Sequence, residues 1–259
     1  MGHTGDFDGD DVLDILLKEK QTARFISQKV YRFFVNDKVD TTKVEWLADR
    51  FYKSDYNISK LIEDIFTSEW FYDEKNIGTR IKSPVELVVG IQRMLPMKLE
   101  NEEALLLIQR VLGQVLFYPP NVAGWPGGKS WIDSSSLMMR MRLPQLINDE
   151  DEINVKPKDD DDQMMGRKDA DDVTIKKPGG VNAMGRQQIN ANVDWSLYLK
   201  NLEKVSREQL VNTMSDYLLQ VKSSIGADVI SQYSDATGRD SFIKTATIQI
   251  MSTPEYQLC

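Results

Sequence analysis

Residues 100–131 read ENEEALLLIQRVLGQVLFYPPNVAGWPGGKSW, and this stretch decides the fold class. Its first half carries apolar residues at the spacing of an amphipathic helix, which predicts a helix over Glu100–Phe117. Pro119 and Pro120 end that helix, because proline lacks a backbone N–H and clashes with the preceding turn. The rest, residues 119–131, is rich in proline and glycine. We expect it to form a loop, called the Pro/Gly/Trp loop, that exposes or seats Trp125 and Trp131.

Helical spacing recurs along most of the chain. Start signals include Asp40 and Asn57 as N-caps, and the capping box Ser83-Pro84-Val85-Glu86. Neither a βαβ alternation nor a run of short β-branched strands is present. The sequence therefore predicts an all-α fold, a multi-helix array of stacked helix pairs. Beside the helix already named, helices are expected over residues 10–17, 22–35, 44–51, 58–70, 85–95, 137–147, 195–202, 210–221, 226–233 and 241–252.

The acidic residues concentrate in one segment. Between Asp149 and Asp172 there are 11 acids and 4 bases, which account for −7 of the net charge of −8. With few large apolar residues, this segment predicts a long acidic disordered insertion. The predicted domains are thus a main helical domain, 1–148, an acidic flexible linker, 149–192, and C-terminal helices, 193–259, that pack back on the main domain.

Composition excludes several classes of protein and site. The chain has one cysteine, Cys259, and one histidine, His3, which argues against a disulfide, a cysteine zinc site and a Ser-His-Asp triad. No apolar run is long enough to span a membrane, no basic face suggests nucleic acid, and no cofactor is expected. Basic side chains such as Lys82, Arg140 and Arg142 are expected to be solvated or paired.

Five aspartates lie close together near the N-terminus, in Asp6-Phe7-Asp8-Gly9-Asp10-Asp11-Val12-Leu13-Asp14. Their spacing resembles a calcium loop, with Asp6, Asp8, Asp10 and Asp14 as candidate metal ligands. The match fails where Asp11 replaces the glycine and Leu17 the final carboxylate, so no metal site is expected. Catalytic roles for Asp8, Asp10 and Asp11 stay open beside a simpler one, in which Asp8 or Asp10 caps the following helix.

The Pro/Gly/Trp loop also has two interpretations. Gly128-Lys129-Ser130 resembles part of a phosphate-binding loop, but Ala123 stands at the first required glycine and Pro126 removes an amide. The two tryptophans are expected either to pack between helices or to contact a ligand. The candidate ligand- or partner-binding residues are Asn121, Trp125, Lys129 and Trp131.

Several of these segments together resemble the C-terminal part of DUF1800, a bacterial protein family of unknown function. They are Phe7–Leu17, Ala23–Val35, Lys82–Val88 and Leu112–Ile132, with the last residues, Ser252–Leu258, resembling the usual family terminus. The most specific part is Pro-Pro-Asn-Val-Ala-Gly-Trp-Pro-Gly-Gly. The resemblance supplies no established catalytic residues.

The resemblance implies more about context than about chemistry. Family members are usually longer and typically begin with an export signal, so this chain would lack an N-terminal half. The full-length protein would be periplasmic or extracellular, although no signal is visible in this chain. Members often accompany a second exported protein, of the sulfatase-like DUF1501 family, which is therefore the partner that the resemblance implies.

Two hypotheses about function follow. The first is an exported accessory or binding module that contacts a partner protein or an envelope glycan, without chemistry of its own in this chain. The alternative is a hydrolase or transferase whose carboxylate-based site is shared with a missing N-terminal half. Whether the protein is an enzyme stays open at this point.

Overall fold

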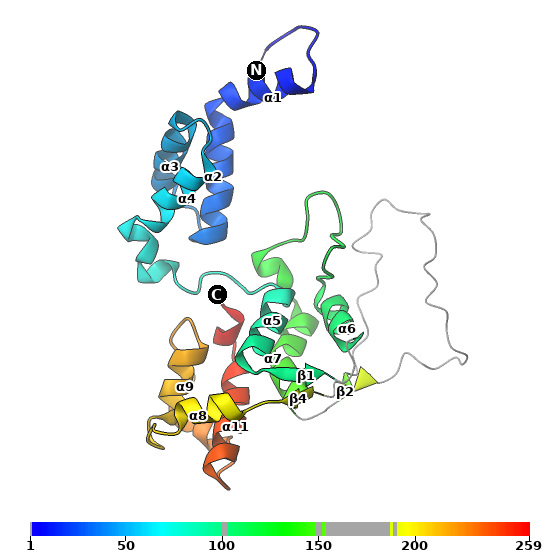
Figure 1. Ribbon diagram of the computed structural model, residues 1–259, viewed down its shortest axis with the longest axis vertical. Coiled ribbons are helices and arrows are strands. Elements are labelled where there is room, and N and C mark those ends of the chain that lie inside the picture. Colours follow the sequence, from blue (N-terminus) through cyan, green and yellow to red (C-terminus); the bar gives the residue numbers. More distant parts are fainter. Residues whose placement is uncertain (1, 100–102, 149–151, 154–186, 189–190) are drawn as a thin grey trace, which may run out of the picture. The chain divides into compact units, whose positions relative to one another are not determined.

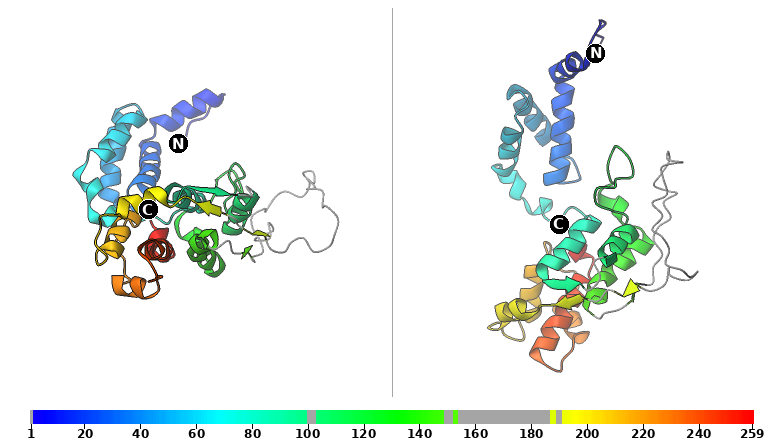
Figure 2. Two further views of the ribbon diagram at one scale, coloured as in Figure 1. Left: turned by 60° about the horizontal axis from the view of Figure 1, so that its bottom comes forward. Right: turned by 45° about the vertical axis from the view of Figure 1, so that its right-hand side comes forward.

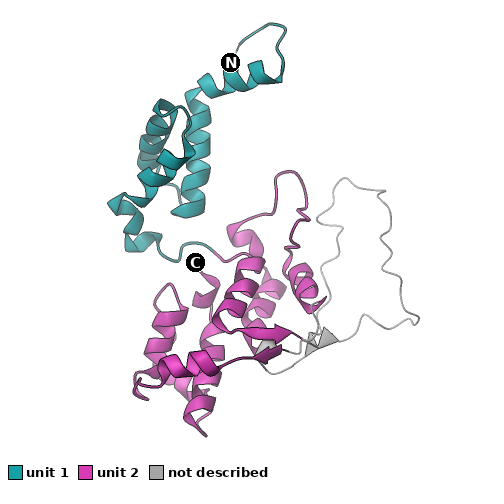
Figure 3. Cartoon of the chain, viewed as in Figure 1, with its two compact units in different colours: residues 1–80 teal, residues 81–259 magenta. Residues whose placement is uncertain are grey.

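The computed structural model describes residues 2–99, 103–148, 152–153, 187–188 and 191–259 (Figure 1). These residues form an all-α fold, which confirms the predicted class. They divide into two compact units, residues 1–80, called unit 1, and residues 81–259, called unit 2 (Figure 3). None of the helices in the described ranges is long and apolar enough to cross a membrane.

Unit 1 is a small helical bundle. Its helices are α1 (Gly9–Lys18), α2 (Lys20–Phe34), α3 (Thr41–Lys53) and α4 (Ile58–Phe66), followed by the short turns η1 (Glu69–Tyr72) and η2 (Glu74–Asn76). The tightest packing joins α2 to α3, and α4 packs against α3. The core is apolar and consists of Ala23, Tyr31, Val35, Val44, Leu47, Phe51, Leu61 and Ile65.

The predicted caps of unit 1 are present. Asp40 Oδ1 accepts a hydrogen bond from the Thr42 amide at 3.1 Å, and Asn57 Oδ1 accepts one from the Lys60 amide at 3.1 Å. The predicted helix 58–70 is too long, because α4 ends at Phe66. The hydroxyls of Thr67 and Ser68 bond back to carbonyls of the last turn, at 2.7 and 2.6 Å, which favours termination there.

Unit 2 is larger and surrounds one buried helix. Its helices are α5 (Pro84–Met94), α6 (Glu103–Leu112), α7 (Ser134–Asn148), α8 (Ser196–Leu202), α9 (Leu210–Leu218), α10 (Ala227–Gln232) and α11 (Arg239–Met251), with the short turns η3 (Gly128–Trp131) and η5 (Glu255–Gln257). Figures 1 and 2 show α11 between α7 and α9. Such a helix must be apolar on most sides, and its buried residues are Phe242, Ile243, Ala246, Thr247, Ile248, Ile250 and Met251.

Two short antiparallel ladders were not predicted. β1 (Met97–Leu99) pairs with β4 (Ala191–Val193), with Met97 opposite Val193. β2 (Glu152–Ile153) pairs with β3 (Gln187–Gln188). Runs of two or three residues are too short to give a periodic signal, which explains the omission.

The predicted domain boundaries remain a prediction. The acidic disordered insertion falls mostly on residues 149–151, 154–186 and 189–190, which lie outside the described residues. Unit 1 ends at Arg80 and unit 2 begins at Ile81. No feature of the sequence marked this position as a boundary.

The helix predicted up to Phe117 is also too long. α6 ends at Leu112, because Gly113 adopts a φ of 86°. The Gln114 amide then bonds back to the Gln109 carbonyl at 2.9 Å, a common way to close a helix. The prolines therefore follow the end of the helix by several residues and do not cause it.

We expect Leu47→Ala to lower the free energy of unfolding by about 3 kcal/mol, because a fully buried leucine leaves a cavity when it is truncated. The matched control in the same unit is Leu13→Ala, whose side chain is 57% exposed and should cost less than about 1 kcal/mol. Urea denaturation followed by far-UV circular dichroism measures both. Equal effects would contradict the described core.

Candidate functional site

The N-terminal aspartates form a helix cap. Asp8 is the N-cap of α1, and its Oδ1 accepts from the amides of Asp10 and Asp11, both at 2.9 Å. The Asp11 carboxylate in turn accepts from the Asp8 amide at 3.1 Å, which completes a capping box. This arrangement gives Asp8 the capping role that the simpler interpretation expected of Asp8 or Asp10, and it gives Asp11 a structural role that was not predicted.

The candidate metal ligands do not converge. Asp6, Asp8, Asp10 and Asp14 are all exposed on the first turns of the chain. Within the part of the chain that the structure describes, no group of three or more His, Cys, Asp or Glu side chains could hold a metal ion. The geometry thus offers no support for metal chemistry at these aspartates.

The Pro/Gly/Trp loop is built from turns. Asn121 shapes one of them, because its carbonyl accepts from the Gly124 amide at 3.0 Å and its Oδ1 accepts from the Ala123 amide at 2.8 Å. Gly124 and Gly128 have φ values of 86° and 59°, which side chains with a Cβ rarely adopt. The glycines therefore fix the course of the loop.

The two tryptophans have different surroundings. Trp131 is buried, and its carbonyl accepts from the buried Ser136 hydroxyl at 3.1 Å. Trp125 is half-buried, whereas Lys129 is exposed. Among the described residues, no hydrogen bond, ion pair or ring contact joins the side chains of Asn121, Trp125, Lys129 and Trp131 to one another. Trp131 thus serves packing, and the binding roles of the other three stay a prediction.

An apolar tip precedes and enters this loop. Its exposed side chains are Leu116, Phe117, Tyr118 and Val122, which we call the 116–122 tip. Phe117 is 96% exposed and has a φ of 63°, the left-handed region that costs a residue with a Cβ about 1 kcal/mol or more. In Figure 1 the segment between α6 and η3 projects from the helices of unit 2.

Two glutamines hold the base of this tip. Gln109 Oε1 accepts from the Leu116 amide at 3.0 Å, and Gln114 Oε1 accepts from the Val85 amide in the first turn of α5, also at 3.0 Å. The tip is therefore anchored by hydrogen bonds while its apolar side chains stay in solvent.

A buried arginine joins three distant segments of unit 2. Arg140 of α7 is fully buried, with Nε donating to Gln257 Oε1 at 3.1 Å and Nη2 donating to the Lys82 carbonyl. Lys82 Nζ donates to the Tyr256 carbonyl at 2.6 Å and lies 3.9 Å from the centre of the Tyr256 ring. We call Lys82, Arg140, Tyr256 and Gln257 the arginine cluster. The backbones also pair, because the Lys82 amide donates to the Gln257 carbonyl at 2.8 Å.

Burial governs the protonation of the arginine cluster. It lowers the pKa of the Arg140 guanidinium to about 10, with the Glu86 carboxylate acting in the opposite direction. Burial also lowers the pKa of Lys82, and the positive charge of Arg140 adds to this effect, while Cys259 and Glu86 oppose it. The cluster therefore contains two partly desolvated cations, Lys82 and Arg140. Removing these charges from water costs free energy.

A buried glutamate lies next to this cluster in the sequence. Glu255 Oε1 accepts from the Ser224 amide at 2.9 Å and from the Ser224 hydroxyl. Burial acts to raise the pKa of Glu255, but hydrogen bonds from Ser224, from the Glu255 amide and from Thr253 together outweigh burial and hold that pKa below its ordinary value. The carboxylate is thus a fixed anchor for the loop before α10.

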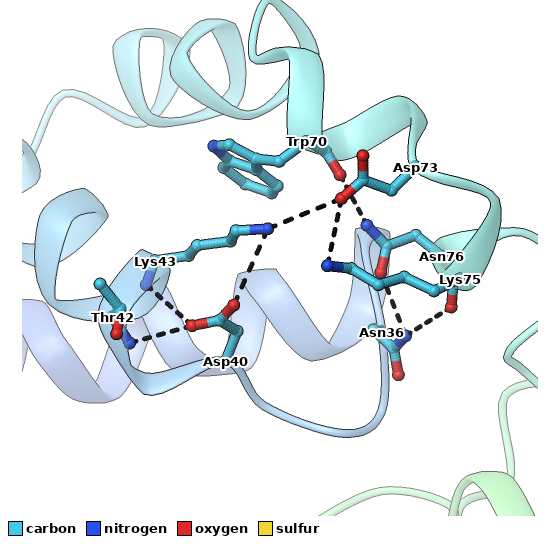
Figure 4. Close-up of polar contacts among 8 residues, drawn as sticks. All are labelled: Asn36, Asp40, Thr42, Lys43, Trp70, Asp73, Lys75 and Asn76. Atoms are coloured by element: carbon cyan, nitrogen blue, oxygen red, sulfur yellow. Dashed lines mark hydrogen bonds and ion pairs between the residues drawn. The ribbon is translucent and has the colours of Figure 1, made fainter.

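Unit 1 has a polar network of its own, shown in Figure 4. The Asp73 carboxylate lies 3.1 Å from Lys75 Nζ and 3.9 Å from Lys43 Nζ. Lys43 Nζ is also 3.8 Å from Asp40 and 4.8 Å from the centre of the Trp70 ring. A cage of two carboxylates and an aromatic ring is therefore already filled by the chain's own ammonium groups, so it does not offer a ligand site.

Amides complete this network. Asn36 Nδ2 donates to the Lys75 carbonyl at 3.0 Å and to Asn76 Oδ1 at 3.1 Å, and Asn76 Nδ2 donates to the Trp70 carbonyl at 2.7 Å. These bonds fasten η1 and η2 to the turn between α2 and α3 (Figure 4).

Sequence reasoning missed the arginine cluster. Arg140 was expected to be solvated or paired, yet it is fully buried, because the segments of Lys82 and Gln257 close over it. The sequence held a weak signal for this cluster. Lys82 and the terminal residues 252–258 both belong to the segments that carry the family resemblance.

The family model described as a protein of unknown function, DUF1800, matches residues 1–258. Comparison with curated proteins gives no match, and comparison with solved structures gives none either.

Replacing Arg140 with lysine should lower the free energy of unfolding by about 1–3 kcal/mol, because one ammonium group cannot reproduce the two directed donors of the guanidinium. Arg142→Lys, two residues along the same helix and exposed, should change it by less than about 0.5 kcal/mol. Denaturant titration at pH 7 distinguishes the two variants. If both behave like the parent protein, the cluster does not stabilise unit 2.

Glu255→Gln should destabilise unit 2 in a pH-dependent way. A folded pKa below the ordinary value of about 4.3 means that the carboxylate stabilises the fold above that value and loses this contribution as pH falls through the folded pKa. The parent protein should exceed the variant by about 1 kcal/mol at pH 7, with the difference shrinking below about pH 4.5. Glu203→Gln, at an exposed position, is the control. Thermal melts from pH 3 to 7 measure the stability of the parent protein and of both variants. A difference that stays constant with pH would refute the ionised anchor.

Proposed function

This chain belongs to the DUF1800 family of proteins of unknown function, and we propose that it is an exported accessory module that binds a partner protein through the 116–122 tip. The proposal concerns recognition and not chemistry. It places the contact at the start of the Pro/Gly/Trp loop, the segment whose sequence is most typical of the family.

The observation that carries the proposal is the conformation of Phe117. An aromatic ring in full contact with water gains nothing from packing, yet its backbone adopts a conformation that costs free energy. A strained and exposed aromatic residue, anchored at its base by Gln109 and Gln114, is the arrangement expected of an interface anchor.

The chemistry of the tip favours a protein over a glycan. Leu116 and Val122 are aliphatic, Phe117 and Tyr118 are aromatic, and all four side chains are exposed. A sugar is recognised through an aromatic face together with directed hydrogen bonds, whereas mixed aliphatic and aromatic side chains suit the apolar core of a protein interface. An envelope glycan is accordingly an outcome that the experiment must distinguish.

The four loop residues singled out from the sequence have supporting roles in this proposal. Asn121 shapes the turn, and Trp131 seats the loop on unit 2. Half-buried Trp125 and exposed Lys129 follow the tip in the sequence and would form part of the rim of the contact.

Export and the identity of the partner rest on the family resemblance. Members typically carry an export signal and accompany an exported protein of the sulfatase-like DUF1501 family, which we propose as the partner. The alternative, a hydrolase or transferase built on Asp8, Asp10 and Asp11, gains no support, because Asp8 and Asp11 are engaged in the cap of α1.

Phe117→Gly tests the proposal with little risk to the fold. Glycine adopts a positive φ freely, so the melting temperature should stay constant or rise, while loss of the ring should weaken binding of the DUF1501 protein from the same cell about tenfold or more. Biolayer interferometry with the immobilised chain measures this. Tyr233→Ser is the control, because Tyr233 is also exposed but lies after α10.

Unchanged affinity of Phe117→Gly for that protein would contradict the proposal. Binding to purified envelope polysaccharide, without binding to the DUF1501 protein, would instead assign the tip to a glycan.

A further inference from the structure

Helix α1 presents an uncovered apolar row. Five of its ten residues are valine, isoleucine or leucine, yet none of its residues is buried. Leu13 and Leu17 lie one helical turn apart, so their side chains form one row, and both are exposed. A helix of this length is marginal by itself in water, since most helical stability in proteins comes from a packed face.

Helix α1 is capped at its first turn and held in place at its last turn. The capping box of Asp8 and Asp11 satisfies the amides of the first turn. At the other end, the Tyr56 hydroxyl donates to the Leu17 carbonyl at 2.6 Å, and the Tyr52 hydroxyl donates to the Lys18 carbonyl at 3.1 Å. The helix is thus capped at its first turn and held by α3 and the turn after it at its last turn, while its side stays open. A helix that is already formed reduces the ordering cost of docking a partner there.

A row of acids runs beside the leucines. Asp10 and Asp14 each precede a leucine of the row by three residues, so they lie next to Leu13 and Leu17 on the helix surface. Like charges four residues apart repel each other and weaken a free helix by a few tenths of a kcal/mol. Among the ion pairs of the described residues, none involves either aspartate.

The acidic row beside the leucine row indicates the chemistry of a partner that would bind this face of α1. A cation placed against Asp10 and Asp14 would relieve their repulsion, while an apolar side chain would cover Leu13 and Leu17. An anionic membrane surface is disfavoured, because it would repel the aspartates. A helix repeats its side chains at the same spacing as these rows, so it can match both at once.

We infer that the α1 row, consisting of Asp10, Leu13, Asp14 and Leu17, docks an amphipathic helix of a partner protein that carries apolar residues one turn apart beside lysine or arginine. This surface belongs to unit 1, whereas the 116–122 tip belongs to unit 2.

The test uses the full chain and a fluorescein-labelled synthetic helix of about 18 residues, long enough to be helical, with leucines one turn apart and flanking lysines. Fluorescence anisotropy at low salt should show saturable binding. Leu13→Ser combined with Leu17→Ser should weaken it at least about tenfold. Asp10→Asn combined with Asp14→Asn should weaken it about three- to tenfold and reduce its salt dependence.

The matched controls are Leu197→Ser and Asp37→Asn, exposed residues remote from α1 in the sequence, which should bind the peptide as the parent chain does. Circular dichroism verifies that every variant is folded. Phe117→Gly should also leave peptide binding unchanged, so that failure of this inference and failure of the proposed function are distinguishable.

Three results would overturn the inference. They are absence of saturable binding, equal binding of a peptide whose lysines are replaced by glutamate, and unaltered binding by the α1 variants. Sedimentation velocity covers a fourth outcome, since self-association that Leu13→Ser abolishes would assign the row to a second copy of this chain.

Discussion

The guanidinium of Arg140 ties together parts of unit 2 that are far apart in the sequence. It donates to the carbonyl before α5 and to the side chain of Gln257 after α11, so one side chain of α7 fixes both ends of the unit. Its burial costs desolvation free energy, in keeping with the lowered pKa, and two directed hydrogen bonds together with the Glu86 carboxylate offset part of that cost. The geometry of Arg140, and not its charge, is therefore the constraint on the neighbouring segments.

The position of α11 follows from this constraint. With Gln257 held by Arg140 and Glu255 held by Ser224, the segment after α11 is fixed on the same side of the unit as α5. The helix itself is then enclosed by α7, α9 and α10, which explains its apolar composition on most sides. The hydrogen bonds of Glu255 and Gln257 thus help to hold α11 in the apolar interior of unit 2.

The elements that the sequence predicted well are those with local causes. The caps at Asp8, Asp40, Asn57 and Ser83 depend on neighbouring residues and are all present. The features that escaped prediction depend on distant partners, as with the pairing of β1 with β4 and the burial of Arg140. In the candidate site, the loop itself was predictable from its prolines and glycines, which act locally. The choice between packing and exposure for Trp131, and the exposure of Phe117, depend on tertiary packing and could not be read from the sequence.

The pairing of β2 with β3 has a consequence for how the protein can change over time. Glu152 lies opposite Gln188 and Ile153 opposite Gln187, so two points of the chain that are far apart in the sequence are neighbours in unit 2. The entropic cost of bringing two points of a chain together grows only with the logarithm of the number of residues between them, and doubling that number costs about 0.6 kcal/mol. A change in the number of residues between 153 and 187 therefore costs little through chain entropy, which favours this place for divergence and for engineered fusions.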